Sequence, residues 1–227
     1  MNYKNFAAIT VCAVLLASTA QASLVSSTAV ADDWFGNTDA TFTSFTVSGT
    51  PDDTFLRTFG ADGSVNRSAL EFSLSGIAPG AIINSAIFTI KSRGTSVAGG
   101  TFNFWGYSGD GAITATDAVE TSNLLTTALT LDVDASFVVD LTALIQSLIN
   151  AASQYAGILI TVSPEGSFFG ADFLSSEGDL NTGFPAGDRP DLTVDFSPAR
   201  TVPEAGTLAL LSLALAGLAA ARRRRRA

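Results

Sequence analysis

Residues 82–91 read IINSAIFTIK, and Ala86, Phe88 and Ile90 recur in this segment at every second position. A period of two places these side chains on one face of an extended strand, whereas an amphipathic helix would need a period near 3.6. The same alternation is present in residues 68–74, SALEFSL. The sequence therefore predicts a fold built mainly from β-strands.

Further strands are expected wherever short apolar runs are bounded by Gly, Asn, Asp and Ser. These runs occupy residues 41–47, 101–107, 129–133, 157–162, 170–175 and 191–196. In residues 101–107, the alternation directs Phe102 and Phe104 toward the core and Trp105 and Tyr107 toward the opposite face.

Residues 141–153 do not follow this alternation. Their apolar side chains have the spacing of one helix face, at Leu141, Leu144, Ile145, Leu148, Ile149 and Ala152. Asp140 or Thr142 can cap the start of such a helix. Many short strands and one covering helix predict a two-layer, jelly-roll-like β-sandwich over residues 23–197.

Charge is distributed unevenly along the 227 residues, whose formal net charge is −9. Six of the twelve cations lie at the ends, as Lys4 and residues 222–226, and residues 23–201 carry six cations against 20 acids. The net charge of −14 over residues 23–201 repels nucleic acid, anionic lipid and acidic polysaccharide. We expect no nucleic-acid partner.

The residue inventory removes several kinds of active site. The chain has no His, and its one Cys, Cys12, lies in an N-terminal apolar run that is expected to be removed. His-based triads, thiol nucleophiles and His or Cys metal sites are therefore excluded from the mature protein. A carboxylate pair for glycoside hydrolysis is conceivable, but so many acids produce such pairs by chance. We predict no catalytic residues, no enzyme activity and no cofactor.

Two ligand-binding interpretations stay open for the body. Calcium prefers oxygen ligands, and its candidates are Asp32 with Asp33, Asp52 with Asp53, and Asp132 with Asp134. None of these pairs belongs to a complete calcium-loop motif, and solvated acids are the simpler interpretation. Trp34, Trp105 and Tyr107 can stack on sugar rings. Trp105 and Tyr107 are the preferred glycan-stacking pair because they share a strand face, although filling a core is the alternative.

Residues 1–22 have the features of a secretory signal peptide. Lys4 precedes an apolar run that is too short to span a bilayer, and Ala20-Gln21-Ala22 forms a small-residue cleavage site. The mature chain should start at Ser23. The expected partners at this stage are the Sec translocon and signal peptidase.

The C-terminal residues 202–227 have a three-part organisation that follows a linker at 198–201. Val202, Pro203 and Glu204 come first, an uncharged segment extends to Ala221, and the chain then has five consecutive arginines: Arg222, Arg223, Arg224, Arg225 and Arg226. Residues 202–221 would span about 30 Å as a helix, enough for a transmembrane helix. The arginine cluster would remain in the cytoplasm and stop transfer, leaving the body periplasmic.

This tripartite tail resembles the PEP-CTERM sorting signal. The resemblance implies recognition of Val202, Pro203 and Glu204 by an exosortase, a membrane-embedded cysteine transpeptidase-like enzyme. It also implies a Gram-negative bacterium that makes exopolysaccharide. The protein would be anchored transiently in the inner membrane, and then reach the cell surface or extracellular matrix.

The body resembles the DNRLRE-type β-sandwich domain, which is kin to carbohydrate-binding modules. The matching segments are 67–74 RSALEFSL, 83–90 INSAIFTI, 139–142 VDLT, 173–177 FLSSE and 189–192 RPDL. Glu177 and Arg189 lie in these segments, and a structural ion pair between them is expected to hold the last strands.

These observations predict an exported, exosortase-processed envelope or matrix protein with a non-catalytic β-sandwich that is associated with exopolysaccharide. Two alternatives stay open: a carbohydrate-binding module that docks on a specific glycan, and a polysaccharide-active enzyme that uses carboxylates.

Overall fold

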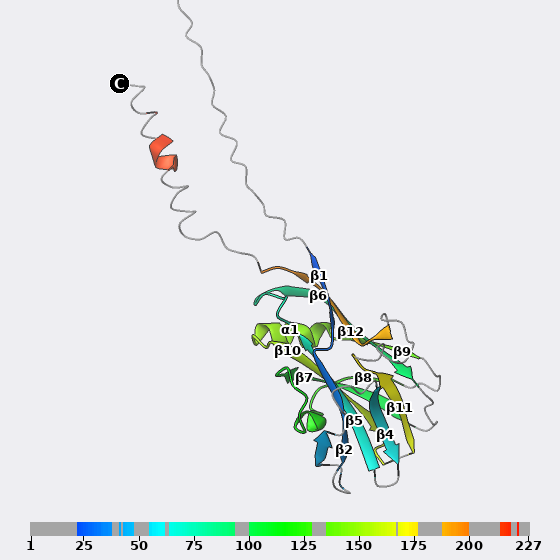
Figure 1. The fold of residues 1–227 in the computed structure, drawn as a ribbon. Helices are drawn as coiled ribbons and strands as arrows, with labels where there is room; N and C mark the ends of the chain where they lie inside the picture. The colour runs from blue at the N-terminus through cyan, green and yellow to red at the C-terminus, as the bar shows by residue number, and fades with distance from the viewer. Residues whose placement is uncertain are drawn as a thin grey trace, which may run out of the picture.

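The computed structural model describes residues 22–37, 41, 43–47, 55–61, 64–93, 100–128, 135–166, 168–176, 188–199, 214–218 and 222. These residues form mainly β structure (Figure 1). The strands are β1 Ser23–Thr28, β2 Ala31–Asn37, β3 Phe45–Val47, β4 Phe55–Ala61, β5 Ser64–Ser73, β6 Ile82–Arg93, β7 Thr101–Gly109, β8 Leu124–Ala128, β9 Ser136–Asp140, β10 Tyr155–Ser163, β11 Phe169–Leu174 and β12 Asp191–Ser197. Helix α1 is Thr142–Asn150, and the 3₁₀-helix η1 is Asp117–Val119.

The strands belong to one 12-stranded sheet with antiparallel pairing. Its main order is β1-β12-β6-β11-β4-β5-β10-β7-β8, and β2 pairs with β5 and β3, while β9 pairs with β6. Strand β6 joins two parts of the sheet, because its residues 82–89 pair with β12 whereas Ser92 and Arg93 pair with β11. The prediction of a mainly β fold with one short helix is confirmed.

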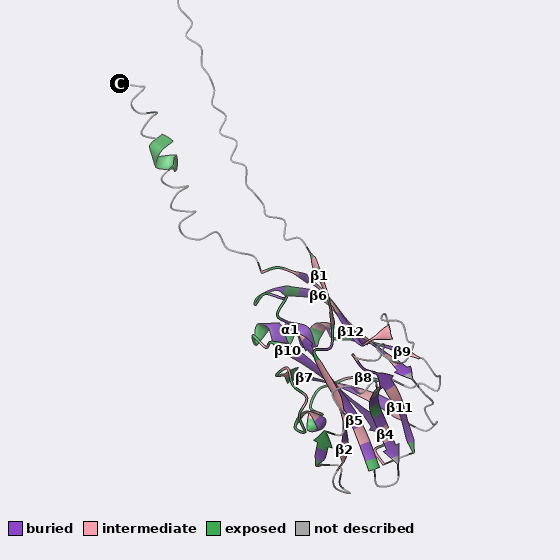
Figure 2. Cartoon of the chain, in the orientation of Figure 1, coloured by how far each residue is buried: buried purple, intermediate pink, exposed green. Residues whose placement is uncertain are grey.

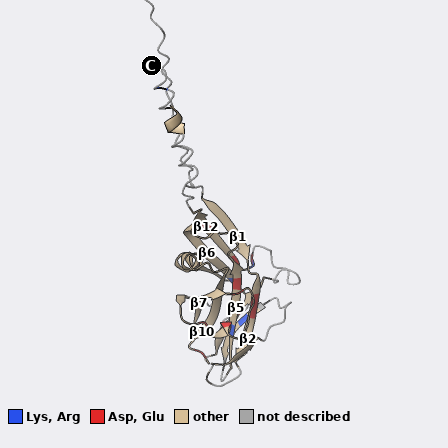
Figure 3. Cartoon of the chain, turned by 90° about the vertical axis from the view of Figure 1, so that its left-hand side faces the viewer, with Lys and Arg blue, Asp and Glu red and all other residues tan. Residues whose placement is uncertain are grey.

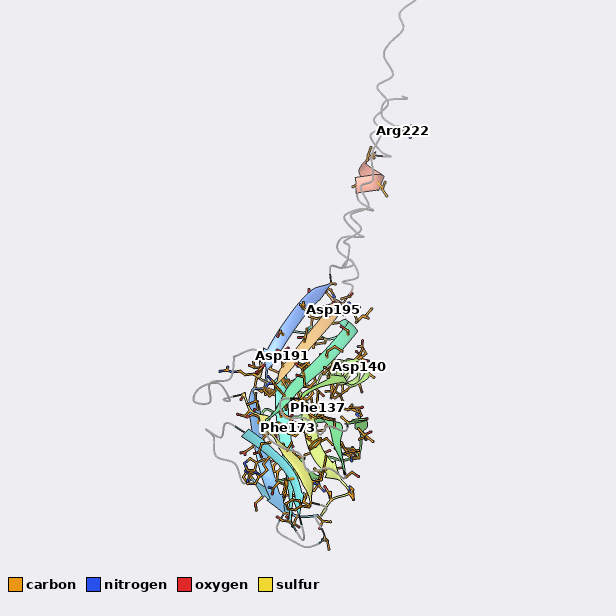
Figure 4. All side chains as sticks on the ribbon, turned by 90° about the vertical axis from the view of Figure 1, so that its right-hand side faces the viewer. Phe137, Asp140, Phe173, Asp191, Asp195 and Arg222 are labelled. Atoms are coloured by element: carbon orange, nitrogen blue, oxygen red, sulfur yellow. The ribbon has the colours of Figure 1, made fainter. Side chains whose placement is uncertain are left out.

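The main core lies between strands that are not neighbours in the sheet. The Phe88 ring in β6 is 5.7 Å from Phe72 in β5 and 6.5 Å from Phe104 in β7, measured between ring centroids. Phe137 in β9 and Phe173 in β11, both labelled in Figure 4, meet at 5.6 Å. Such edge-to-face contacts add to the area that aromatic rings bury. Figure 2 shows this interior as the purple segments of the strands.

Helix α1 covers one side of this core through Leu144, Ile145, Leu148 and Ile149, all of which are buried. The predicted helix face is therefore confirmed for these residues. Ala152 does not belong to it, because α1 ends at Asn150, two residues before Ala152, which is exposed with a positive φ.

The start of α1 is fixed by polar contacts with β6. The Asp140 carboxylate accepts a hydrogen bond from the Thr142 N–H at 2.8 Å, and the Thr142 hydroxyl accepts one from the Ala86 N–H at 3.0 Å. Further along, Gln146 accepts from the Ile83 N–H and donates to the Ala81 carbonyl. After β9 ends, α1 therefore continues to satisfy the backbone groups on that side of β6.

The predicted strands have different outcomes. Those at 68–74, 82–91, 101–107, 157–162, 170–175 and 191–196 correspond to β5, β6, β7, β10, β11 and β12. The prediction at 41–47 was too long, since only Phe45–Val47 is a strand, and residues 129–133 lie outside the described residues. Strands β1, β2, β4, β8 and β9 were not predicted.

The N-terminal signal segment, expected to be a helix, and the C-terminal transmembrane helix fall largely on residues that the structure does not describe. Of the signal segment only Ala22 is described, and of residues 202–221 only the helical residues 214–218. Within the described part of the chain, no helix is long and apolar enough to cross a membrane.

Candidate functional site

The first and last strands place both ends of the body together. Ser23, the predicted first mature residue, opens β1 and pairs with Phe196 of β12. Ser197, the last residue of β12, pairs with Ile82. The chain therefore enters and leaves the body at the same end, which we name the tether end and which Figures 1 and 3 show at the top.

Strand β12 is held on both sides at this end, because it pairs with β1 along one edge and with β6 along the other. An ion pair of 2.8 Å between Lys91 in β6 and Asp188 also secures the residues just before β12. Glu177 lies outside the described residues, so the predicted Glu177–Arg189 pair stays a prediction.

The residues of the predicted sorting tail follow β12 after the short linker 198–201. Val202, Pro203, Glu204 and Arg223–Arg226 lie outside the described residues, as does Ala20 of the cleavage site; Arg222 is described, as exposed and helical. Residues 201–226 match the PEP-CTERM protein-sorting motif. This motif implies an exported protein that is sorted to the cell surface and processed by an exosortase. No curated protein matches the chain, and the family of the body is not identified.

The predicted glycan-stacking pair lies in a second, smaller core. Tyr107 is 5% exposed there, and its neighbours are Phe35, Phe45, Val65, Ala69, Ala118 and Leu159. Trp105 is partly buried against this cluster, and its indole N–H donates to the Thr161 hydroxyl at 3.0 Å. The predicted alternation in β7 is confirmed, since Phe102 and Phe104 face the main core while Trp105 and Tyr107 face the second core. The Tyr107 ring, however, has almost no surface to offer a ligand, and stacking at Trp105 stays a prediction.

A buried arginine joins this second core to the loop that carries η1. Arg67 in β5 is 6% exposed and forms a two-pronged pair with Glu165, with both N–H···O distances at 2.8 Å. It also donates to the Ala118 carbonyl at 2.5 Å, and its guanidinium lies 4.3 Å from the Phe45 ring centroid. These contacts tie β5 to Glu165 and to the η1 loop, which gives Arg67 a structural role.

Glu71 lies four residues after Arg67 on β5, so it is on the same face of the strand, and it is fully buried. It accepts hydrogen bonds from the N–H groups of Asp110 at 3.1 Å and Gly111 at 2.5 Å. Burial raises the pKa of Glu71, the Gly111 N–H opposes that shift, and the carboxylates of Asp117 and Asp110 add to it. Glu71 therefore anchors the start of the loop that Arg67 holds at Ala118.

Gly157 makes room for the ring of Tyr107. Residue 157 of β10 pairs with Glu71 on one side and with Tyr107 on the other. A Cβ atom at this position would lie 2.2 Å from the Tyr107 Cζ, so only glycine fits. Burial, followed by the Asp117 and Glu71 carboxylates, raises the pKa of the Tyr107 hydroxyl.

Of the calcium candidates, two accept hydrogen bonds from backbone N–H groups, and the other four lie outside the described residues. Asp32 accepts from the Ser176 N–H at 2.6 Å, and Asp33 accepts from the Trp34 N–H at 2.7 Å. Asp52, Asp53, Asp132 and Asp134 are not described. Among the described residues, no three His, Cys, Asp or Glu side chains are grouped so that they could hold a metal ion.

A partly exposed group lies on β2, on β4, and on β11 together with the residue just before it, and sequence analysis had singled out only its Trp34. We name it the aromatic strip: Trp34, Arg57, Phe59, Phe168 and Asp172. The Arg57 guanidinium is 5.7 Å from the Trp34 ring centroid, and its Nε donates to Asp172 at 3.1 Å. The Phe59 and Phe168 rings meet edge to face at 5.4 Å, and Phe168 is 64% exposed. The sequence indicated one member of this strip, Trp34, as a ring that can stack on a sugar, whereas the strand that carries Arg57 and Phe59 was not predicted.

Proposed function

We propose that this chain is an exported protein of the cell envelope or extracellular matrix, which an exosortase processes at its C-terminal tail. The observation that carries this proposal is the PEP-CTERM motif at residues 201–226, immediately after a β domain whose last strand ends at Ser197. The expected partners are the Sec translocon, signal peptidase, the exosortase and, before processing, the inner membrane.

The distance between the body and the motif supports a juxtamembrane reaction. Residues 198–202 separate the end of β12 from Pro203, and five extended residues reach at most about 18 Å. Because β12 is paired on both edges, it would not supply further extended chain without unfolding the body. The exosortase would therefore act close to the membrane surface on a folded substrate.

We also propose that the body is a jelly-roll-like β-sandwich without catalytic function. Support for the sandwich comes from the contacts of β6 and β9 with β5, β7 and β11 across the main core. Support for a non-catalytic role comes from the carboxylates: Glu71 binds backbone N–H groups, Glu165 is paired with Arg67, and Asp172 is paired with Arg57. An association with exopolysaccharide completes the proposal.

A comparison of intact masses tests the sorting proposal. We expect the protein from cells with the exosortase to lack the five-arginine end, and the protein from an exosortase-deletion strain to retain it. Pro203→Ala and Glu204→Ala should block processing by an order of magnitude or more while leaving membrane insertion intact, because neither change touches the apolar segment or the arginine cluster. Pro198→Ala, which removes a proline outside the matched residues 201–226, is the matched control. Equal processing of all four proteins would contradict the proposal.

A second candidate function, a carbohydrate-binding module, is favoured by the aromatic strip, because the strip combines rings and a hydrogen-bonding ion pair on the outside of the body.

A further inference from the structure

We infer that the aromatic strip of Trp34, Arg57, Phe59, Phe168 and Asp172 is a binding surface for a neutral polysaccharide chain. The inference rests on the proposed export to the cell surface, and it places the glycan contact away from Trp105 and Tyr107.

The pairing of β4 with β11 places most of the strip on one outer face. Arg57 pairs with Asp172, and Phe59 pairs with Gly170. Side chains two residues apart on a strand point to the same side, so Arg57 and Phe59 share a face with Asp172. The intervening Thr58 faces the other way and donates a buried hydrogen bond to Ser68.

A glycine makes room for the Phe59 ring on this face. A Cβ at Gly170 would lie 2.5 Å from the Phe59 Cα and 2.6 Å from its Cδ2. Its absence lets the Phe59 ring lie across β11, where the edge of Phe168 meets it. Phe168 is 64% exposed, and its contact with Phe59 extends one apolar patch over this face; a contiguous patch of this kind favours a contact surface.

The chemistry of the strip suits a neutral sugar. Aromatic faces accept the apolar C–H faces of pyranose rings, while Arg57 offers hydrogen-bond donors and Asp172 offers acceptors for hydroxyl groups. The side chains of Arg57 and Asp172 are 52% and 35% exposed, so both can be reached. Their charges cancel, and the net charge of −14 over residues 23–201 disfavours an acidic chain.

The position of the strip fits a tethered protein. Strands β2 and β4 lie toward the end of the body opposite the tether end, and β11 runs beside β4 (Figure 1). A body held at the membrane through residues 198–202 would therefore present the strip outward, toward extracellular polymer.

Calorimetric titration of the processed, cell-derived protein tests the inference, with neutral hexasaccharides of glucose, mannose and galactose and with hexagalacturonate as the acidic probe. We expect binding to at least one neutral probe and none to hexagalacturonate. Phe168→Ala and Trp34→Ala should each weaken binding about three- to tenfold, the range for loss of one aromatic contact. Arg57→Lys, which keeps the charge but loses the guanidinium fork, should also weaken it.

Val119→Ala is the matched control, because Val119 is an apolar residue 46% exposed elsewhere on the body, and it should leave binding unchanged. Circular dichroism of Phe168→Ala should match wild type, since the ring is mostly in solvent. The inference is overturned if no neutral probe binds, if Trp105→Phe removes binding while Phe168→Ala does not, or if the strip variants abolish only a self-association seen by sedimentation. The mass of the same samples reports exosortase processing separately, so either proposal can fail without the other.

Discussion

The two faces of strands β5, β10 and β7 are both buried, but their chemistry differs. The main-core face carries apolar side chains such as Phe72, Ile158 and Phe104. The opposite face buries Arg67, Glu71 and Tyr107 among apolar neighbours, and η1 packs over it. Figure 3 shows the charged segments on and near β5. The main core is stabilised by area removed from water, whereas the second core depends on charged groups that must keep their partners.

The largest expected effect is on the main-core face. Phe104→Ala removes a fully buried ring that contacts Phe88 and Phe137, and we expect the free energy of unfolding to fall by about 3–5 kcal/mol. Chemical denaturation of the exported protein measures this change. Leu124→Ala, at a side chain 47% exposed on neighbouring β8, is the control and should cost far less. Similar losses in both variants would show that the main core does not dominate stability.

A second prediction compares how much a buried and an exposed ion pair contribute to the free energy of unfolding. Glu165→Ala leaves the Arg67 guanidinium buried without its partner, and we expect a loss of about 3 kcal/mol. Asp172→Ala, which removes the partner of the exposed Arg57, should cost under about 1 kcal/mol. Denaturant midpoints of both variants give the comparison, and equal midpoints would remove the distinction between the two pairs.

A third prediction concerns pH and Glu71. Because the folded-state pKa of Glu71 is raised by burial, the folded protein holds this proton more tightly than the unfolded chain does. The stability from Glu71 is fully present below the unfolded-state pKa and is lost as pH rises through the folded-state pKa.

The side chain of Glu71→Gln cannot titrate. As pH rises, the free energy of unfolding of wild type should therefore fall relative to that of this variant. Denaturation curves from pH 4 to pH 8 measure the difference. A difference that does not change with pH would show that Glu71 has an ordinary pKa.

Another small effect is expected outside both cores, at the start of α1. Asp140→Ala removes the acceptor for the first N–H of α1 and should cost about 1 kcal/mol, while Asp140→Asn keeps an acceptor and should cost less. Hydrogen bonds from the Thr142 hydroxyl and N–H lower the pKa of Asp140, so this contribution is present above its unfolded-state pKa and is lost as pH falls through the lower, folded-state value. Thermal denaturation of wild type and the two variants gives their order of stability. An Asn variant as unstable as the Ala variant would contradict the role of Asp140 as the acceptor for the Thr142 N–H at the start of α1.

The sequence predicted best the strands with a long, regular alternation, such as β6 and β12. It missed β9, whose alternation of buried Phe137 and Val139 covers only five residues, and β2, whose Asp32, Asp33 and Gly36 disfavour a strand by propensity. Strand β2 forms nevertheless because its pairing with β5 buries Phe35 in the second core. Tertiary contacts override local propensity at such positions.

Trp34 was a stacking candidate from the sequence, but the aromatic strip as a group was not predictable, because its members are far apart in the chain. Phe59 and Phe168 meet only through the pairing of β4 with β11, and Trp34 reaches Arg57 from a third strand. The same limit applies to Tyr107, since alternation shows which residues share a face but not whether a loop covers that face.

The sequence by itself determined the β class, the helix face of α1 and the sorting tail, because each is written in consecutive residues as a period or an ordered motif. Only the tertiary structure decided that Tyr107 is buried, that Arg67 and Glu71 hold the η1 loop, and that an aromatic strip lies on β2, β4 and β11. These features depend on which strands become neighbours, and that choice follows from the burial of the whole chain rather than from any one segment.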